Sequence, residues 1–435
     1  MDIDILIKNG LILHFDKETQ TESIAISNGK ILEIGKNLDR KYQANRIIEA
    51  ENKIVIPGFV NTHTHAAMSY FKGLADDLPL HEWLSQHIWP AEAKFLSPEF
   101  VEDASLYGCA EMIKNGITCF NDMYFFGDQT AKSAEKVGIR AVLGEGVLDF
   151  SAANHKNADE ILSLINEMHQ KYLDNQLIDF AVAPHSIYTC GKANLIKARD
   201  LANKLGLLVH IHISEAKQEI EDSLTKNGVR PVEYLHSFGF FEGDTIAAHA
   251  IWLDEEEKLI LAETNTSVAI NISSNLKLAC GFMSLKNYID KGINLSIGTD
   301  SVASNNNLSI FQEMSLISKL QKSINEDPTL LPAKDILQIA TLGGAKALGK
   351  SNMIGSLETG KRADIILVDV QNIQAQPLYD PFSQLVYSLN SENIKDVIVN
   401  GKIVMLDRIL VNIDELELIE KAKYYQNIIK KFNNG

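Results

Sequence analysis

The chain has 435 residues, of which 45% are hydrophobic and 23% are charged, close to the average for globular proteins. Its length exceeds the usual size of one domain, so we expect a large catalytic domain and a smaller module. The formal net charge is −16, and we find no stripe of basic residues in the sequence. Both observations disfavour nucleic-acid binding. No apolar run is long enough to span a membrane, and the acidic start is unlike a signal peptide, so we expect a cytoplasmic protein.

The cysteines are few and widely spaced. Cys109, Cys119, Cys190 and Cys280 form no Cys-x-x-Cys pair. This spacing predicts neither a disulfide framework nor a zinc–thiolate site. We expect four buried free thiols.

Both ends of the chain have the pattern of antiparallel sheet. Near the start, the dipeptides Asn9-Gly10 and Asn28-Gly29 each separate two apolar runs, and Asn400-Gly401 does so near the other end. Asn-Gly between apolar runs predicts a hairpin, because both residues tolerate the positive φ of a type I′ turn. After the last of these hairpins, the pattern from about residue 413 predicts one final helix.

Between the two ends, short apolar strands alternate with amphipathic helices such as 99–114 and 193–205. The predicted strands are 55–63, 116–122, 140–147, 180–185, 207–212, 245–249, 267–272 and 294–299. Eight such units predict a parallel (β/α)8 barrel, whose strands are buried on both faces. The alternative is an open, doubly wound sheet. Such a sheet normally carries a glycine-rich phosphate turn after its first strand, where this chain has His63-Thr64-His65.

Ionisable side chains follow several of these strands. His63 and His65 close the first strand, His185 the fourth, His212 the fifth, His249 the sixth and Asp300 the eighth. In a barrel these positions converge on the C-terminal mouth, where active sites lie. Residues two apart on a strand point the same way, so the pair of histidines on the first strand can bind one ion together.

We predict that His63, His65, His212 and Asp300 hold a divalent metal ion. One such histidine alone is more often a hydrogen-bonded core residue, but this combination at strand ends is hard to explain as core. Three imidazoles and a carboxylate suit Zn²⁺ best, with Fe²⁺, Mn²⁺ and Ni²⁺ as alternatives.

Glu215 follows His212 by three residues and lies just beyond the strand end. A carboxylate there can stand beside the attacking water and shuttle a proton. The alternative interpretation is a charge that favours a helix N-terminus. Asp300 can bind the ion with one oxygen and accept a proton with the other, so both acids are candidate catalytic residues.

The segment Val55-Ile56-Pro57-Gly58-Phe59-Val60-Asn61-Thr62-His63-Thr64-His65 resembles the first barrel strand of the amidohydrolase superfamily. Segments 66–68, 73–80, 88–92, 144–150, 274–279 and 360–364 are similar, within that superfamily, to the deaminases of 5′-methylthioadenosine and S-adenosylhomocysteine. The similarity covers nearly the whole chain. Sister deaminases and triazine hydrolases share much of the pattern.

The resemblance implies a barrel over residues 58–355 and a small β-sandwich built from residues 1–57 and 356–435. It also implies hydrolytic removal of the 6-amino group of an adenine thioether nucleoside. Glu92 then binds the ribose hydroxyls, His185 contacts the purine, and His249 orients the attacking water. Glu215 and Asp300 touch the substrate during proton transfer.

The same resemblance bears on the number of metal ions. Binuclear relatives place a bridging carboxylated lysine or a glutamate on the fourth strand. Here that strand reads Ala181-Val182-Ala183-Pro184-His185, with neither residue, so we predict one ion for each subunit.

Two segments depart from the family pattern. Relatives often carry an arginine for the far end of the substrate where this chain has Ser151-Ala152-Ala153-Asn154-His155-Lys156. This places that contact in doubt, with Lys156 or Asn154 as weak substitutes. The seventh strand ends at Asn271, where relatives more often have His-Cys-Pro, and the role of Asn271 stays open.

Several alternatives remain for the activity. The chain could deaminate adenosine, aminodeoxyfutalosine or another heterocycle, act as a triazine-type hydrolase, or be a scaffold without activity. Retention of the whole set of metal and acid residues disfavours the scaffold. Glu92 favours a substrate that contains ribose. The expected partner is a small nucleoside, and the architecture favours a homo-oligomer.

Overall fold

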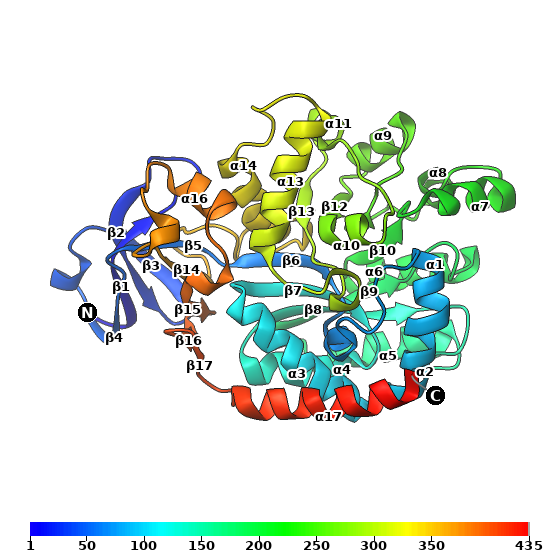
Figure 1. Ribbon diagram of the computed structural model, residues 1–435, viewed down its shortest axis with the longest axis horizontal. Coiled ribbons are helices and arrows are strands. Elements are labelled where there is room, and N and C mark those ends of the chain that lie inside the picture. The colour runs from blue at the N-terminus through cyan, green and yellow to red at the C-terminus, as the bar shows by residue number, and fades with distance from the viewer. Residues whose placement is uncertain (434–435) are drawn as a thin grey trace.

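In the computed structural model, which describes residues 1–433, the chain forms a closed barrel with a separate sheet beside it (Figure 1). The barrel strands are β6 (Phe59–Thr64), β7 (Ile117–Tyr124), β8 (Arg140–Val147), β9 (Ile178–Pro184), β10 (Val209–Ile213), β11 (Thr245–His249), β12 (Ser267–Ile270) and β13 (Leu295–Ile297). All pair in parallel, and β13 pairs with β6 to close the ring. The predicted (β/α)8 barrel is confirmed, and the open sheet is excluded.

Helices surround the barrel and cover the outer faces of its strands. Those of eight or more residues within the barrel region are α3 (Pro98–Lys114), α4 (Gly127–Val137), α5 (Ala158–Lys171), α6 (Lys192–Leu205), α7 (Lys217–Asn227), α9 (Glu255–Glu263) and α13 (Ile310–Ile324). Shorter helices are α1 (Leu80–Glu82), α2 (Trp89–Phe95), α8 (Pro231–His236), α10 (Ile272–Lys277), α11 (Leu285–Asp290), α12 (Val302–Asn305), α14 (Ala333–Gln338), α15 (Gly344–Ala347) and α16 (Pro381–Tyr387). Because helices cover one face and the barrel interior the other, β7 and β8 are buried along their whole length.

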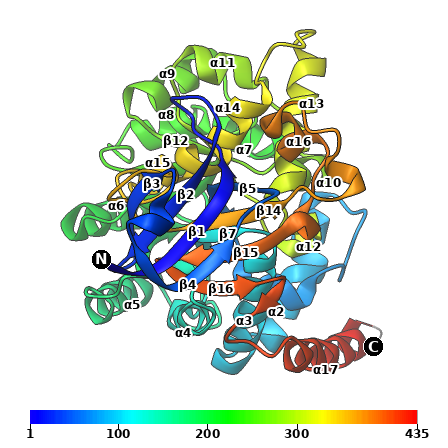
Figure 2. The ribbon, with the colours of Figure 1, turned by 90° about the vertical axis from the view of Figure 1, so that its left-hand side faces the viewer.

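Strands from both ends of the chain form one nine-stranded sheet. Most of its pairs are antiparallel, as the Asn-Gly patterns predict, but its first strand pairs in parallel with the fourth and the fifth. The strands are β1 (Asp2–Ile12), β2 (Gln20–Ser27), β3 (Lys30–Gly35), β4 (Gln43–Glu49), β5 (Lys53–Pro57), β14 (Ile365–Asp369), β15 (Ile394–Val399), β16 (Lys402–Leu406) and β17 (Ile409–Leu410). β5 lies between β1 and β14, so the two ends of the chain meet across it. In Figure 2 the blue N-terminal strands and the orange C-terminal strands lie side by side.

Two of the three Asn-Gly hairpins are confirmed. Asn28-Gly29 joins β2 to β3 and Asn400-Gly401 joins β15 to β16, with positive φ at all four residues. The hairpin predicted at Asn9-Gly10 is wrong, because both residues lie inside β1 at a bulge. Here only the asparagine has positive φ, and a Cβ on the glycine would lie 2.5 Å from a methyl group of Val55. The glycine therefore serves close packing between strands.

The first predicted barrel strand is in fact two strands in different sheets. Residues 53–57 form β5 of the terminal sheet, and β6 of the barrel begins at Phe59. Gly58 divides them, and a Cβ there would lie 2.0 Å from Oγ1 of Thr118. The seventh strand is also shorter than predicted, because the chain enters α10 directly after Asn271.

A buried ion pair joins the barrel to the terminal sheet. Nε of Arg140 on β8 lies 3.1 Å from Oδ2 of Asp364, next to β14, and both side chains are 2% exposed. Arg140 also donates to the carbonyl of Gln176, and the backbone amide of Asn400 donates to Asp364. All the polar groups of this pair are therefore satisfied where the two sheets meet.

The last helix, α17 (Glu415–Asn433), runs back along the barrel beside α3, as the red ribbon in Figure 1 shows. Tyr425 stacks on Tyr70 at a centroid distance of 4.8 Å and meets the edge of Phe100 at 5.1 Å. Phe432 contacts Phe95 at the end of α2. This helix therefore covers the aromatic side chains that support α2.

Two further sequence expectations concern thiols and membranes. The four cysteines are buried and free, as predicted. None of the helices within residues 1–433 combines the length and apolarity that a membrane crossing needs.

Candidate active site

The predicted site residues meet at the C-terminal mouth of the barrel. His63, His65, His212, His249 and Asp300 lie on or directly after β6, β10, β11 and β13, while Glu92 lies on α2, His185 follows β9 and Glu215 follows β10. All of these except His63 line one cavity of about 470 Å³, a volume typical of small-molecule sites. His63 is fully buried at the base of the cavity.

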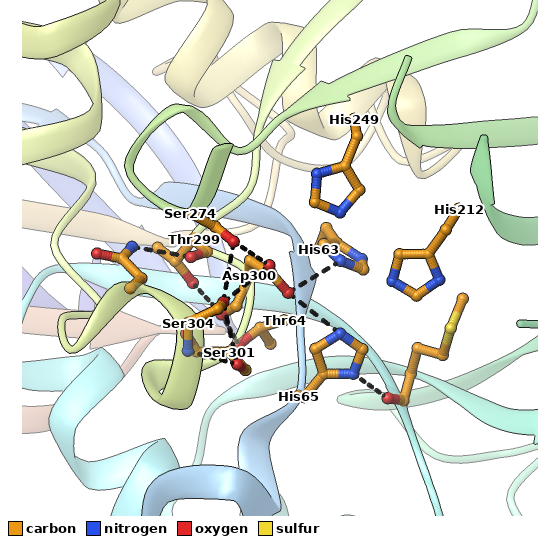
Figure 3. Close-up of polar contacts among 12 residues, drawn as sticks. His63, Thr64, His65, His212, His249, Ser274, Thr299, Asp300, Ser301 and Ser304 are labelled. Atoms are coloured by element: carbon orange, nitrogen blue, oxygen red, sulfur yellow. Dashed lines mark hydrogen bonds and ion pairs between the residues drawn. The ribbon is translucent and has the colours of Figure 1, made fainter. Parts of the chain in front are cut away.

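Two of the predicted ligands have one ring nitrogen engaged with the backbone. Nδ1 of His65 donates to the carbonyl of Met123, and Nδ1 of His212 donates to the carbonyl of His185 at 2.9 Å. Because Nδ1 of each ring is engaged by a carbonyl, Nε2 is the nitrogen left to bind a metal ion. In Figure 3 both rings lie beside His63, and a dashed line joins His65 to Asp300.

The ring of His63 is held by His210, a histidine outside the predicted set of site residues. Its Nδ1 lies 2.9 Å from Nε2 of His210, and the side-chain amide of Asn121 lies 2.9 Å from the other nitrogen of His210. Nε2 of His63 is buried and makes no hydrogen bond among the described residues. A buried nitrogen without a hydrogen-bond partner can bind a cation.

Asp300 divides its two oxygens between two tasks. Oδ2 accepts hydrogen bonds from the hydroxyls of Ser274 at 2.5 Å and Ser304 at 2.9 Å. Oδ1 faces the histidines, 3.3 Å from Nε2 of His63 and 3.2 Å from Nε2 of His65 (Figure 3). One carboxylate oxygen therefore remains directed toward the cluster.

The donor atoms are close enough to share one ion. Those of His63, His65 and His212 all lie within 4.8 Å of one another, as do those of His63, His249 and Asp300. Burial lowers the pKa of His63 to about 4 and that of His212 well below its ordinary value, which keeps both imidazoles neutral. Burial opposes ionisation of Asp300, but the two facing imidazoles hold its pKa well below the usual range. Two neutral imidazoles beside an ionised carboxylate fit a divalent cation.

Glu215 lies beside this cluster. Its Oε1 is 3.8 Å from Nδ1 of His249, and that nitrogen also lies 2.7 Å from Oδ1 of Asn275. Burial raises the pKa of Glu215, and the imidazole of His249 partly offsets this. A carboxyl group with a raised pKa can both release and recover a proton near neutral pH.

A second glutamate holds the backbone of Glu215. The two oxygens of Glu219, on the first turn of α7, accept hydrogen bonds from the amides of Ser214 and Glu215 at 2.9 and 3.0 Å. The segment that carries Glu215 is therefore fixed at its backbone.

The backbone is strained at three strand exits that carry site residues. Ser214, His249 and Asp300 have φ values of 52°, 67° and 56°, in the left-handed region that favours glycine. The amide of Asp300 is held by a hydrogen bond to the carbonyl of His63 at 2.9 Å. Strain of this kind persists where surrounding contacts fix it, and it concentrates at functional sites.

Glu92 lies on the cavity wall, one aromatic ring away from the cluster. The hydroxyl of Tyr124 donates to its Oε1 at 2.7 Å, and the ring of Tyr124 lies 6.3 Å from that of His65. Burial raises the pKa of Glu92 to about 7, although the Tyr124 hydrogen bond opposes the rise. This side chain is an acceptor placed at the side of the cavity, where polar groups of a ligand can reach it.

Three residues left open by the sequence lie away from the cavity. Asn154 donates to Glu145 on β8, and Lys156 is exposed, with its amide bound to Glu160. Asn271 is fully buried and makes no side-chain hydrogen bond among the described residues. None of the three lines the cavity.

Sequence reasoning missed four residues that support the site, namely His210, Glu219, Ser274 and Ser304. The sequence could have identified His210, because it precedes His212 by two residues on one strand and its side chain therefore points the same way. The two serines and Glu219 lie on helices and act only through their positions in three dimensions.

Known proteins resemble this chain in both sequence and fold. The model of the amidohydrolase family matches residues 54–404. A 5-methylthioadenosine/S-adenosylhomocysteine deaminase from Thermodesulfovibrio yellowstonii is 47% identical over 95% of each chain. A 5′-deoxyadenosine deaminase from Methanobrevibacter smithii is 42% identical over 97% of each chain. The solved structure of an adenosine deaminase from Xanthomonas campestris with bound zinc has a TM-score of 0.96, at 38% identity over 99% of each chain. The chain belongs to the amidohydrolase family.

Proposed function

We propose that this protein hydrolytically deaminates adenine nucleosides with a thioether or similar 5′ substituent, converting the 6-amino group to a 6-oxo group. The convergence of four imidazole nitrogens and one carboxylate oxygen beside a buried glutamate carries the proposal. Relatives named for 5′-methylthioadenosine, S-adenosylhomocysteine and 5′-deoxyadenosine support the substrate class.

The metal ligands in this proposal are His63, His65, His212 and Asp300, and the ion is Zn²⁺, one for each chain. The zinc-bound relative supports the choice of metal. The fourth barrel strand, with alanines and a proline before His185, offers no bridging ligand for a second ion. When bound, the ion supplies Lewis acidity that lowers the pKa of a bound water toward about 7.

The side chains of the chain perform the proton transfers. As water adds to C6 of the purine, the carboxylate of Asp300 takes one of its protons, with the imidazole of His249 orienting the water. Glu215 gives its proton to N1, so negative charge does not accumulate on the ring. Then Asp300 passes its proton to the amino group, the C6–N bond breaks and ammonia leaves. Glu215 recovers its proton from the new hydroxyl group.

Two further residues orient the substrate. Glu92 accepts hydrogen bonds from the ribose hydroxyls, and His185 contacts the purine. Its Nδ1 lies 3.1 Å from the hydroxyl of Thr189, which fixes the ring. The half-buried acceptor on α2 favours a nucleoside over a triazine or a free base, because without ribose its only donor among the described residues is the hydroxyl of Tyr124.

An ammonia-release assay on metal-loaded protein tests the proposal. We expect turnover of 5′-methylthioadenosine, 5′-deoxyadenosine or S-adenosylhomocysteine, and little with adenine or a chlorotriazine. Metal analysis is expected to give one zinc for each chain. A fully metallated sample that leaves every aminopurine nucleoside unchanged contradicts the proposed activity.

A further inference from the structure

The outer part of the cavity is apolar. α2 contributes Trp89, three residues before Glu92, and Leu96 follows Glu92 by four, so both share its face of the helix. The loop after β8 contributes Phe150, Ala152 and Ala153. We call Trp89, Leu96, Phe150, Ala152 and Ala153 the apolar collar. Trp89 is 40% exposed and Phe150 51%, which places the collar at the opening of the cavity.

Among the described residues, no lysine or arginine reaches this collar. Within residues 1–433, no lysine or arginine lines the cavity. Lys156 is exposed on the loop after β8, and Lys277 is engaged by Asp76 and Asn306. A carboxylate that enters the collar therefore finds no charged partner from the described part of the chain.

The loop after β8 is held so that it presents small side chains. The amide of Ala152 donates to the carbonyl of His155 at 2.9 Å, which closes a tight turn. Asn154, at the centre of that turn, donates to the buried carboxylate of Glu145. With Asn154 directed toward Glu145, the turn leaves the methyl groups of Ala152 and Ala153 at the cavity.

We propose that this collar selects nucleosides with a short uncharged 5′ substituent, such as methylthio or methyl, over those with an amino-acid substituent. The inference rests on the proposed deaminase function. A methylthio group gains from leaving water for an apolar surface. The ammonium and carboxylate of a homocysteine substituent lose part of their hydration against this surface and gain no charged partner from the described residues.

The direct test compares kcat/KM of metal-loaded protein for three nucleosides. We expect values for 5′-methylthioadenosine and 5′-deoxyadenosine at least about tenfold above that for S-adenosylhomocysteine. An equal or higher value for S-adenosylhomocysteine overturns the selectivity while leaving the deaminase function intact. Inactivity on all three nucleosides overturns the proposed function and the selectivity with it.

A binding measurement and a designed variant separate affinity from chemistry. Calorimetric titration of E215Q is expected to give weaker binding of S-adenosylhomocysteine than of 5′-methylthioadenosine, and equal binding contradicts the proposal. A153R places a cation at the collar and is expected to raise kcat/KM for S-adenosylhomocysteine relative to 5′-methylthioadenosine about tenfold. A153M adds a long side chain without charge and is expected to leave the ratio low. An unchanged ratio in a folded A153R protein contradicts the role of the collar.

Discussion

Individual side chains at the barrel mouth have two polar atoms, and the protein engages one of them so that the other faces the cavity. Nδ1 of His212 is engaged by a carbonyl, and Oδ2 of Asp300 by two hydroxyls. These contacts fix which atom each residue presents and hold its rotamer. Glu215 differs, because its backbone is held by Glu219 while its carboxyl group has the role of proton exchange in the proposed mechanism.

The variant E215Q separates proton transfer from metal binding. Because glutamine has the same shape but cannot exchange a proton at N1, we expect kcat to fall by about 10²–10⁴-fold. Metal content should be unchanged, because this side chain is not among the proposed ligands. Ammonia release and metal analysis on the same sample measure both. E221Q, at an exposed position on α7 shortly after Glu215, is the matched control, and loss of metal from E215Q would make Glu215 a structural residue.

The sequence predicts the residues that end strands but not those that support them. His63, His65, His212 and Asp300 could be recognised because parallel strands of a barrel finish at one face, so position along the chain implies position in space. Ser274 and Ser304 lie on short helices whose approach to Asp300 depends on packing. No local pattern specifies such an approach.

One buried carboxylate, that of Glu145, joins a strand, a helix and a loop near the site. Glu145, near the end of β8, accepts hydrogen bonds from the amides of Phe126 and Gly127 at the start of α4 and from Asn154 in the following loop. Burial raises its pKa to about 7, against the effect of these donors. One side chain therefore connects a strand, a helix and the loop of the apolar collar.

The change of protein stability with pH should depend on the carboxyl group of Glu145. Its pKa in the folded state lies above the ordinary value of 4.5, so the folded state binds the proton more tightly. The resulting stability is fully present below about pH 4.5 and is lost as the pH rises through about 7. Between about pH 5 and pH 8 we expect the melting temperature of the wild type to fall more than that of E145Q. E420Q removes an exposed carboxylate as the control, and parallel curves for wild type and E145Q would refute the assignment.

The packing of α17 can be tested at one pair of neighbouring tyrosines. Tyr425 is 9% exposed and lies against Tyr70 and Phe100, whereas Tyr424 is 62% exposed. Because Y425A removes a packed ring, we expect a loss of about 2–4 kcal/mol in the free energy of unfolding. Y424A should cost less than about 0.5 kcal/mol. Thermal or urea unfolding measures both, and similar losses would show that α17 is not docked as described.

Local patterns predicted the elements themselves with uneven success. The Asn-Gly signal identified two hairpins, where both residues have positive φ, and failed at Asn9-Gly10 inside β1. The failure arises because glycine also serves close packing, which a sequence does not distinguish from a turn. The division at Gly58 was missed for a related reason, since apolar residues continue on both sides of it.

At the scale of the whole molecule, a buried ion pair lies where the barrel and the terminal sheet meet, beside apolar contacts between them. Removal of one partner leaves the other charged and without compensation, so D364N is expected to cost about 3–5 kcal/mol. The exposed pair of Lys197 and Asp159 is the control, because D159N should cost at most about 1 kcal/mol. Unfolding of both variants gives the comparison. Equal losses would mean that the pair of Arg140 and Asp364 does not stabilise the junction.

The interleaving of both chain ends in one sheet has a consequence during translation. β5 is flanked by β1, which leaves the ribosome early, and by β14, which leaves it late. Until Ile365 and the residues after it emerge, one edge of β5 has no partner and Arg140 has no Asp364. A nascent chain that stops short of these strands therefore displays an unpaired strand and an unneutralised guanidinium to chaperones and proteases. Cellular quality control can thus distinguish finished copies from unfinished ones before any substrate is bound.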